Sequence, residues 1–455
     1  MHIAGDVTHP RIIASGATFA VTRRTTLRKM FLAPWHPEVS AAWLYALADA
    51  QADTGIAVHL GNRVLTHHHL TVTVDEPNLP DFLKRVHHDI SCALNTLLAR
   101  ERYDAPGELF DKRSSHCMRV VDAPAQATQL VYDYNNGVAA GLVQRPEHMP
   151  GYVFDFDLWR RGSLEVKRPD FYFSKNRPET LELIVTPPPA LYAAFGGDLD
   201  KLIYHMKRMA NASGMALRAA QKRPVVGAEA LTQIHPWDEP KTLRERGGRL
   251  VPSFRIGARG IVGRQLYHDA VEDTRNFRRR HEAARQARLA GNLEEPFPYA
   301  TYLMRVLHKA PVEPPPPPGV GVVTCPGETL AQVKARLERE RAERAARAEQ
   351  LVQAEQASAH VALVQEATAA LVEEAESLIE DASAELGELR EPSPPPATGS
   401  HAGRAERRPS LTRHRFSKRL SAREAQSVRR VITLRDKRSR KPGRPKRPEG
   451  SDPPA

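Results

Sequence analysis

The chain has 455 residues, with 66 lysines and arginines against 54 aspartates and glutamates, 41% hydrophobic residues, 37 prolines and three cysteines. Its apolar runs are shorter than the roughly 18 residues that a membrane helix needs, and its cysteines are too few for a disulfide framework. These features exclude a membrane protein and a disulfide-stapled secreted protein. Because the first residues also lack the layout of a signal peptide, we expect a cytoplasmic, nucleoid-associated protein.

Charge and proline content divide the chain into segments. Residues 401–455 carry 18 basic and 5 acidic side chains, a net +13, whereas residues 327–391 carry 7 and 15, a net −8. Five consecutive prolines at 314–318 favour an extended linker. The expected organisation is listed in chain order: a first domain over 1–150, a second region over 151–312, a linker over 313–326, a helical arm over 327–391 and a disordered basic tail over 392–455.

The first 150 residues alternate between strand-like and helix-like patterns. The predicted elements are a strand at 18–22, a helix at 39–52, strands at 56–60 and 64–74, a helix at 79–100, a strand at 117–121 and a helix at 125–143. Gly55 is expected to end the first helix, and Gly61-Asn62 to form a hairpin turn between the second and third strands. This order predicts an α+β fold in which helices cover a sheet.

Later segments are predominantly helical. The patterns predict a strand at 181–185 and helices at 199–219 and 273–290. Residues 329–388 are rich in Ala, Glu, Arg and Gln and contain no proline, so we expect one long helix. Heptad spacing is interrupted there, which leaves a solvated helix and a coiled coil as alternatives.

Three consecutive histidines lie within the predicted strand 64–74, which reads VLTHHHLTVTV. Because strand side chains alternate between the two faces, His67, His69 and Thr71 should share one face and His68 should point to the other with Leu70. Two neighbouring imidazoles can chelate one divalent cation. The alternative is that the histidines end a strand in solvent.

Tyr132 and Asn136 lie four residues apart in the predicted helix 125–143 and should therefore share a helical face. A phenol is a candidate nucleophile and an amide oxygen is a neutral metal ligand. Beside a cation held by two histidines, this pair would suit attack on a phosphodiester. The cation would help the phenolate to form despite an ordinary tyrosine pKa of about 10. The alternative is that Tyr132 is a half-buried helix aromatic without a chemical role.

Several short motifs occur along the chain in a fixed order: LTHHHL at 65–70, LFDKR at 109–113, YDYNNGVAAGLV at 132–143 and RPE at 145–147. Over residues 18–150 their order and spacing resemble the single-tyrosine HUH transposases, in particular the REP-associated tyrosine transposases. FPYATY at 297–302 resembles a motif of the longer members of that family and extends the likeness to about residue 309.

The resemblance implies that His67, His69 and Asn136 bind Mg²⁺ or Mn²⁺, and that Tyr132 forms a 5′-phosphotyrosine link with single-stranded, hairpin-containing DNA. It also implies an antiparallel sheet with helices on one face, as in RNA-recognition motifs, and a homodimer. Three positions differ from the family pattern: His68 stands where an apolar residue is usual, Thr66 where Asn is common and Gly137 where Pro is common. These differences leave a second hypothesis, a catalytically inactive, domesticated DNA-binding protein.

Basic residues are candidates for DNA contacts. Arg23 and Arg24 follow the first strand, and Lys112 and Arg113 precede the strand at 117–121, so both pairs are expected either to hold a DNA backbone beside the histidines or to be solvated surface. In the tail, residues 441–448 read KPGRPKRP and resemble an AT-hook, which would insert its basic side chains into the minor groove of duplex DNA. Those side chains are Arg444, Lys446 and Arg447. The tail could instead bind phosphates without sequence preference, bind RNA or serve as a localisation signal.

A third hypothesis is a metal-dependent hydrolase, in which a carboxylate from Asp75 or Glu76 would join the two histidines. It is the weakest of the three, because no second acidic cluster with ligand spacing accompanies His67 and His69.

Overall fold

A computed structural model describes residues 10–112, 115–151, 154–240, 252–316 and 330–388. The chain divides into two compact units, residues 1–360 and 361–455. The first unit holds every strand of the described residues and all the helices, the last of them only up to residue 360. In the second unit the described residues, 361–388, continue that helix.

A five-stranded sheet forms the centre of the first unit. Its strands are β1 (Thr18–Arg24), β2 (Ala57–Arg63), β3 (His67–Thr73), β4 (His116–Val120) and β7 (Phe254–Arg255), in the order β2-β3-β1-β4-β7. The expected α+β class is confirmed, but the expectation of a wholly antiparallel sheet is wrong. β7, which lies more than a hundred residues further along the chain, pairs with β4 in parallel.

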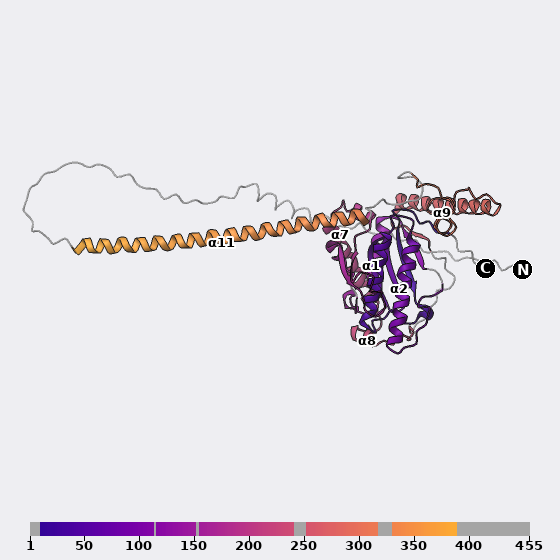
Figure 1. Cartoon of the computed structure of the whole chain (residues 1–455), viewed down its shortest axis with the longest axis horizontal. Coiled ribbons are helices and arrows are strands. Elements are labelled where there is room, and N and C mark those ends of the chain that lie inside the picture. Colours follow the sequence, from indigo (N-terminus) through magenta and orange to yellow (C-terminus); the bar gives the residue numbers. More distant parts are fainter. Residues whose placement is uncertain (1–9, 113–114, 152–153, 241–251, 317–329, 389–455) are drawn as a thin grey trace, which may run out of the picture. The chain divides into compact units, whose positions relative to one another are not determined.

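Helices cover both faces of the sheet, whereas the sequence predicted one covered face. α1 (Pro37–Thr54) and α2 (Leu79–Arg100) lie side by side in Figure 1 and pack over the face that carries Leu70 and Val72. On the opposite face, Ala125 of α3 (Ala123–Tyr134) packs against Ala20 and Met118. That second face also carries buried threonines, of which Thr18 and Thr73 hydrogen-bond to each other.

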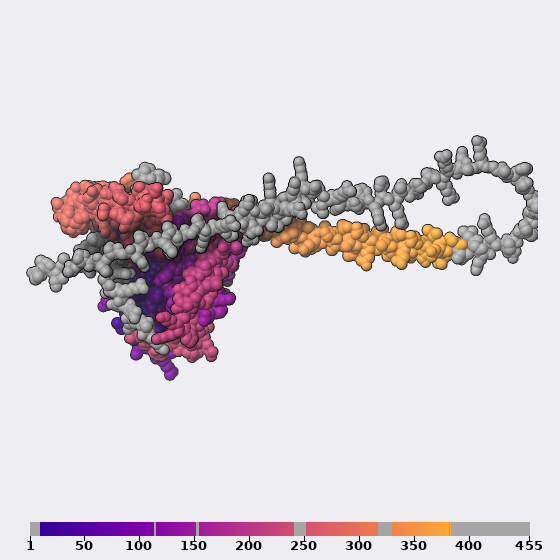
Figure 2. Space-filling model, turned by 180° about the vertical axis from the view of Figure 1, so that it is seen from behind, coloured from indigo at the N-terminus to yellow at the C-terminus, as the bar shows by residue number. Residues whose placement is uncertain are grey.

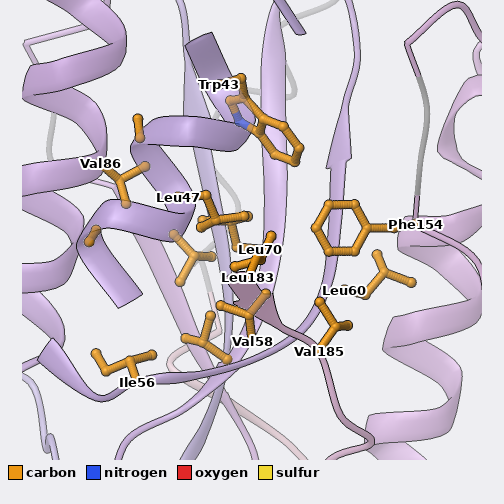
Figure 3. Close-up of a cluster of buried hydrophobic side chains, with 14 of the residues drawn as sticks. Trp43, Leu47, Ile56, Val58, Leu60, Leu70, Val86, Phe154, Leu183 and Val185 are labelled. Atoms are coloured by element: carbon orange, nitrogen blue, oxygen red, sulfur yellow. The ribbon is translucent and has the colours of Figure 1, made fainter. Parts of the chain in front are cut away.

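The hairpin between β2 and β3 turns at residues 64–66 and not at Gly61-Asn62, which lie inside β2. The Val64 N–H donates to the His67 carbonyl across this turn. Gly61 is needed for packing and not for turning, since a Cβ there would lie 2.7 Å from the Trp43 ring and 3.2 Å from Phe154. Figure 3 shows these two rings beside the sheet. They meet edge to face, with ring centroids 5.9 Å apart.

The predicted helix 125–143 is broken. α3 ends at Tyr134, and a short helix, α4 (Asn136–Ala139), follows after Asn135. The Asn135 side chain donates to the Ala210 carbonyl of α7 (Leu199–Ala220). Gly141 then adopts φ +70°, a left-handed conformation that ends the helical segment. Packing against α7 therefore accompanies a break that local propensity does not indicate.

Residues after 150 share the core of the sheet domain, where Phe154, Leu183 and Met206 belong to the same buried cluster as Trp43 and Leu47. Their elements are α5 (Leu158–Arg161), β5 (Ser163–Lys167), β6 (Thr180–Ile184), α6 (Pro189–Ala194), α8 (Ala228–Thr232), α9 (Gly260–Leu289) and α10 (Leu303–Val306). β5 and β6 form a separate antiparallel pair. α9 starts earlier than the predicted residue 273. Two 3-10 turns, Thr26–Arg28 and Pro146–His148, complete the described elements.

The long helix α11 (Leu330–Glu388) matches the predicted segment. Only its first turns pack inside the first unit, where Leu330, Val333 and Leu337 are buried with Ile184. From residue 341 to 381 every side chain is exposed, as the orange surface in Figure 2 shows. Within the described residues, no helix combines the length and the apolar character that crossing a bilayer requires.

Candidate active site

Strand β3 separates its histidines as period-two alternation predicts. The rings of His67 and His69 lie on one face with centroids 4.8 Å apart. His68 points into the opposite layer, where its Nδ1 accepts a hydrogen bond from Trp43 of α1 and its Nε2 lies 3.0 Å from His87 Nε2 of α2. The structure therefore gives His68 a packing role and leaves His67 and His69 as the candidate metal-binding pair.

His69 is enclosed by partners from four elements. Its register partners on the neighbouring strands are Thr22 of β1 and Asn62 of β2. His69 Nδ1 lies 3.1 Å from the Thr22 hydroxyl and 3.4 Å from an Asp133 carboxylate oxygen, while Nε2 lies 2.9 Å from Asn136 Nδ2. The ring orientation is thus fixed before any ligand arrives. The sequence did not point to Thr22 or Asn62, because their proximity depends on strand pairing, and the proximity of Asp133 depends on the packing of α3.

Asp133 is a buried carboxylate beneath the site. It accepts hydrogen bonds from Thr71 and Gln129, and Asn62 donates to its backbone carbonyl. Burial raises the pKa of Asp133 to about 7, although the Thr71 and Gln129 bonds act in the opposite direction. A carboxylate beside the non-coordinating nitrogen of a metal-ligating histidine fixes the tautomer of that ring and increases its basicity. In the sequence, the only feature that marks Asp133 is its position between Tyr132 and Tyr134.

Both imidazoles are neutral near pH 7. Burial, followed by the Arg24 charge, lowers the pKa of His67 to about 4. Burial, followed by the neighbouring histidines His67 and His68, lowers the pKa of His69 well below its ordinary value. A neutral imidazole keeps a lone pair for coordination, so the protonation state favours metal binding.

Tyr132 and Tyr134 lie in very different environments. Tyr132 is 53% exposed, and its ring lies edge-on to His69 with centroids 6.0 Å apart. Tyr134 is buried, stacks on Phe156 and donates from its hydroxyl to Glu147. Burial and that hydrogen bond raise the pKa of Tyr134. Of the two, Tyr132 alone presents its phenol beside the histidines.

The donor set fits a divalent cation. His67 and His69 offer two neutral nitrogens from one strand face, and Asn136 brings an amide to the same point. In the structure, the Asn136 amide nitrogen faces His69. An amide flip, which exchanges two nearly indistinguishable groups, would present the oxygen instead. Among the described residues no cluster of three or more His, Cys, Asp or Glu side chains could hold a metal, so this site depends on the amide.

The other predicted contact residues are dispersed. Arg24 pairs in register with His67, and its positive charge helps to lower the pKa of His67. Arg23 points to the opposite face, over the Phe110 ring. Lys112 is exposed near Glu108. Arg113 and the tail residues Arg444, Lys446 and Arg447 lie outside the described residues.

Neither carboxylate of the hydrolase hypothesis lies near the histidines. Asp75 follows the far end of β3, six residues beyond His69, which corresponds to about 20 Å along a strand. Its carboxylate accepts a hydrogen bond from the backbone N–H of Leu330 at the start of α11. The acidic group beside His69 is Asp133.

No family model matches the chain, and a search of curated proteins found no match. Among solved structures, the chain is similar to a REP-associated tyrosine transposase bound to a REP hairpin, with 14% identity, 38% of this chain and 93% of that chain covered, and a TM-score of 0.27. It is also similar to a putative transposase from Deinococcus radiodurans R1, with 16% identity, 26% and 85% covered, and a TM-score of 0.19. Neither TM-score is high enough to establish a common fold.

Proposed function

We propose that this chain cleaves and rejoins single-stranded DNA by transesterification through Tyr132. The observation that carries the proposal is the position of an exposed phenol edge-on to His69, next to two neutral imidazoles on one strand face. Exposure lets a polymeric substrate reach the hydroxyl, while the buried network below keeps the imidazoles fixed.

His67, His69 and Asn136 would hold the divalent cation, Mg²⁺ or Mn²⁺. When bound, it would polarise a phosphate oxygen and stabilise the charge that develops during displacement. Asp133 and Thr22 keep the His69 ring in one orientation through Nδ1, so Nε2 is the nitrogen directed at Asn136 and the cation. Asp133 is therefore a positioning residue.

The chemical step conserves the number of phosphoester bonds. The Tyr132 oxygen attacks phosphorus, the bond between phosphorus and the 3′ oxygen breaks, and a 5′-phosphotyrosine forms. The phenol proton passes to solvent, which reaches this exposed ring, and the leaving 3′ oxygen takes up a proton from solvent. Attack by another 3′-hydroxyl on the phosphotyrosine reverses the step and rejoins DNA, so no external energy source is needed.

Charge supports a nucleic-acid substrate. Arg24 of β1 is the cross-strand register partner of His67, and residues 401–455 carry a net +13. We extend the proposal to hairpin-containing single strands as substrate, to duplex DNA as the ligand of the tail and to a homodimer as the working state. A basic tail of this kind would make affinity fall steeply with salt.

A second candidate, DNA binding without catalysis, is favoured by one observation. Both ring nitrogens of His69 are occupied, Nδ1 by Thr22 and Asp133 and Nε2 by the Asn136 amide nitrogen. If the amide stays in this orientation, His69 offers no lone pair to a cation. The protein would then bind DNA through its basic segments alone.

A covalent-trapping experiment separates the two functions. Single-stranded hairpin DNA, labelled on the 3′ side of candidate cleavage sites, is incubated with the full chain and Mg²⁺ or Mn²⁺, then denatured and resolved on a gel. A label that stays attached to protein, and is lost when the metal is chelated beforehand, supports transesterification. DNA binding without an adduct under either metal supports the non-catalytic function.

A further inference from the structure

A positively charged cavity lies at the edge of the sheet opposite β2. A cavity of about 180 Å³ opens between β4, β7, α9 and the segment before β1. Three arginines line it, Arg11, Arg119 and Arg278, and no acidic side chain is among the described residues that line it. These arginines are far apart in sequence, so only the fold brings them together.

Arg119 is the central group of the cavity. It is 4% exposed, and its Nη1 is buried without a hydrogen-bond partner among the described residues. Arg278 Nε is buried without one in the same way. Two N–H groups of charged side chains in one small cavity are thus unsatisfied, which is unfavourable unless a ligand or solvent accepts from them.

Arg11 and Arg119 also contact uncharged groups of the cavity wall. Arg11 donates to the Ser115 carbonyl and to Cys117 Sγ, both uncharged acceptors. The Arg119 guanidinium lies over the Phe254 ring. Burial lowers the pKa of Arg119, while Asp273 of α9 opposes that effect. The unsatisfied N–H groups of Arg119 and Arg278 are therefore the ones left to bind an anion.

Arg119 points away from the candidate active site. Met118 and Val120 of β4 pack against Ala125 of α3, on the face that carries His69. Because side chains alternate along a strand, Arg119 points to the other face. His116, which also lines the cavity, lies on the face of His69 and contributes to lowering the pKa of His69, so one residue links the cavity to the candidate active site.

We propose that this cavity is a binding site for one phosphate group. Guanidinium groups match the oxygens of phosphate in geometry and charge. The volume is below the roughly 300–1,000 Å³ typical of pockets that enclose a drug-sized ligand, so a phosphate group enters and anything attached to it stays outside. The group comes either from free inorganic phosphate or from a nucleic-acid backbone.

The test measures phosphate binding to the full chain by calorimetry and by thermal shift, against chloride at equal ionic strength. Arg119→Met and Arg278→Met each remove one guanidinium, and Arg275→Met, on the same helix as Arg278 but exposed and outside the cavity, is the matched control. We expect binding about tenfold or more weaker in the first two variants and unchanged in the control. Arg278→Met keeps the test decisive if Arg119→Met fails to fold.

A second arm uses a short single-stranded oligonucleotide without a hairpin, to identify the source of the phosphate. Loss of affinity for both phosphate and oligonucleotide in Arg278→Met identifies a backbone phosphate, and loss for inorganic phosphate alone identifies the free anion. Either result supports the site. No phosphate-specific effect on the wild-type chain, or equal binding by the cavity variants and the control, would overturn it.

Discussion

Asn136 Nδ2 lies 2.9 Å from His69 Nε2, although a break in the helix at Asn135 separates Asn136 from Tyr132. In an unbroken helix the two side chains would share a face four residues apart. Here α3 and α4 each bring one side chain to His69. Asn136 of α4 contacts the ring nitrogen Nε2, and Tyr132 of α3 lies edge-on to the ring. The spatial relation that the proposed chemistry needs is therefore present despite the different backbone path.

Tyr132→Phe is expected to abolish the covalent adduct and to leave DNA binding intact, because the ring remains while the nucleophilic oxygen is lost. Tyr134→Phe is the control. It removes the hydrogen bond to Glu147 and should lower the free energy of unfolding by about 1 kcal/mol without affecting the adduct. The trapping gel and urea unfolding measure these effects. An adduct that survives Tyr132→Phe and disappears with Tyr134→Phe would assign the nucleophile to the other tyrosine.

Asp133→Asn should weaken Mn²⁺ binding by about 10- to 100-fold, because it removes the carboxylate that orients His69. Adduct formation at subsaturating Mn²⁺ should fall in parallel and recover partly at high Mn²⁺. Calorimetric titration of the folded variant measures the affinity. Asp157→Asn, which alters a surface ion pair with Lys207, is the control. Equal Mn²⁺ affinity in the two variants would remove Asp133 from the site.

Acid should destabilise the fold through its buried histidines. Burial lowers the pKa of His59 to about 4, against the hydrogen bond to the Thr186 carbonyl, which acts in the opposite direction. The unfolded chain, with an ordinary histidine pKa of about 6.5, then binds more protons than the folded chain between pH 6.5 and 4. Stability contributed by neutral His59 is complete above pH 6.5 and decreases by about 3 kcal/mol as the pH falls to 4.

Urea unfolding of wild type and His59→Gln across this pH window measures the difference. The wild-type free energy of unfolding should fall more steeply towards pH 4 than that of the variant. His268→Gln, at an exposed position of α9, should retain the wild-type slope. Parallel curves for wild type and His59→Gln would show that His59 titrates alike in the folded and unfolded chains.

Leu337→Ala should loosen the first turns of α11 from the first unit. Leu337 is 3% exposed and fills the space beside Gly162, where a Cβ would lie 2.5 Å from its side chain. Removing a buried leucine costs about 2 kcal/mol or more, which corresponds to roughly 30-fold faster amide exchange in residues 330–341 if exchange occurs through undocking. Leu351→Ala, at a 67% exposed position, should leave exchange in residues 330–341 unchanged.

Deletion of residues 401–455 should weaken DNA binding and reduce its salt dependence. This segment carries a net charge of +13, whereas the whole chain carries +12, so the rest of the chain is close to neutral. Cleavage of a short oligonucleotide at high protein concentration should persist, since Tyr132 and the histidines remain. Affinity measured at several salt concentrations gives the slope. An unchanged slope would mean that the tail has a partner other than DNA.

The local pattern of the sequence determined several features, because each depends on neighbours along the chain. Period-two alternation places His67 and His69 together and His68 apart. Amphipathic spacing predicted the bounds of α2, and high helix propensity without proline predicted α11. The α+β class followed from the order of these elements.

Tertiary structure decided the rest, since the deciding contacts join residues distant in sequence. Packing of Trp43 and Phe154 over Gly61 keeps that glycine inside a strand and moves the hairpin turn. Pairing of β1 and β2 with β3 brings Thr22 and Asn62 beside His69, and the packing of α3 adds Asp133. A periodic pattern shows which face a side chain occupies but not what it meets there, because that depends on which strands and helices pack together.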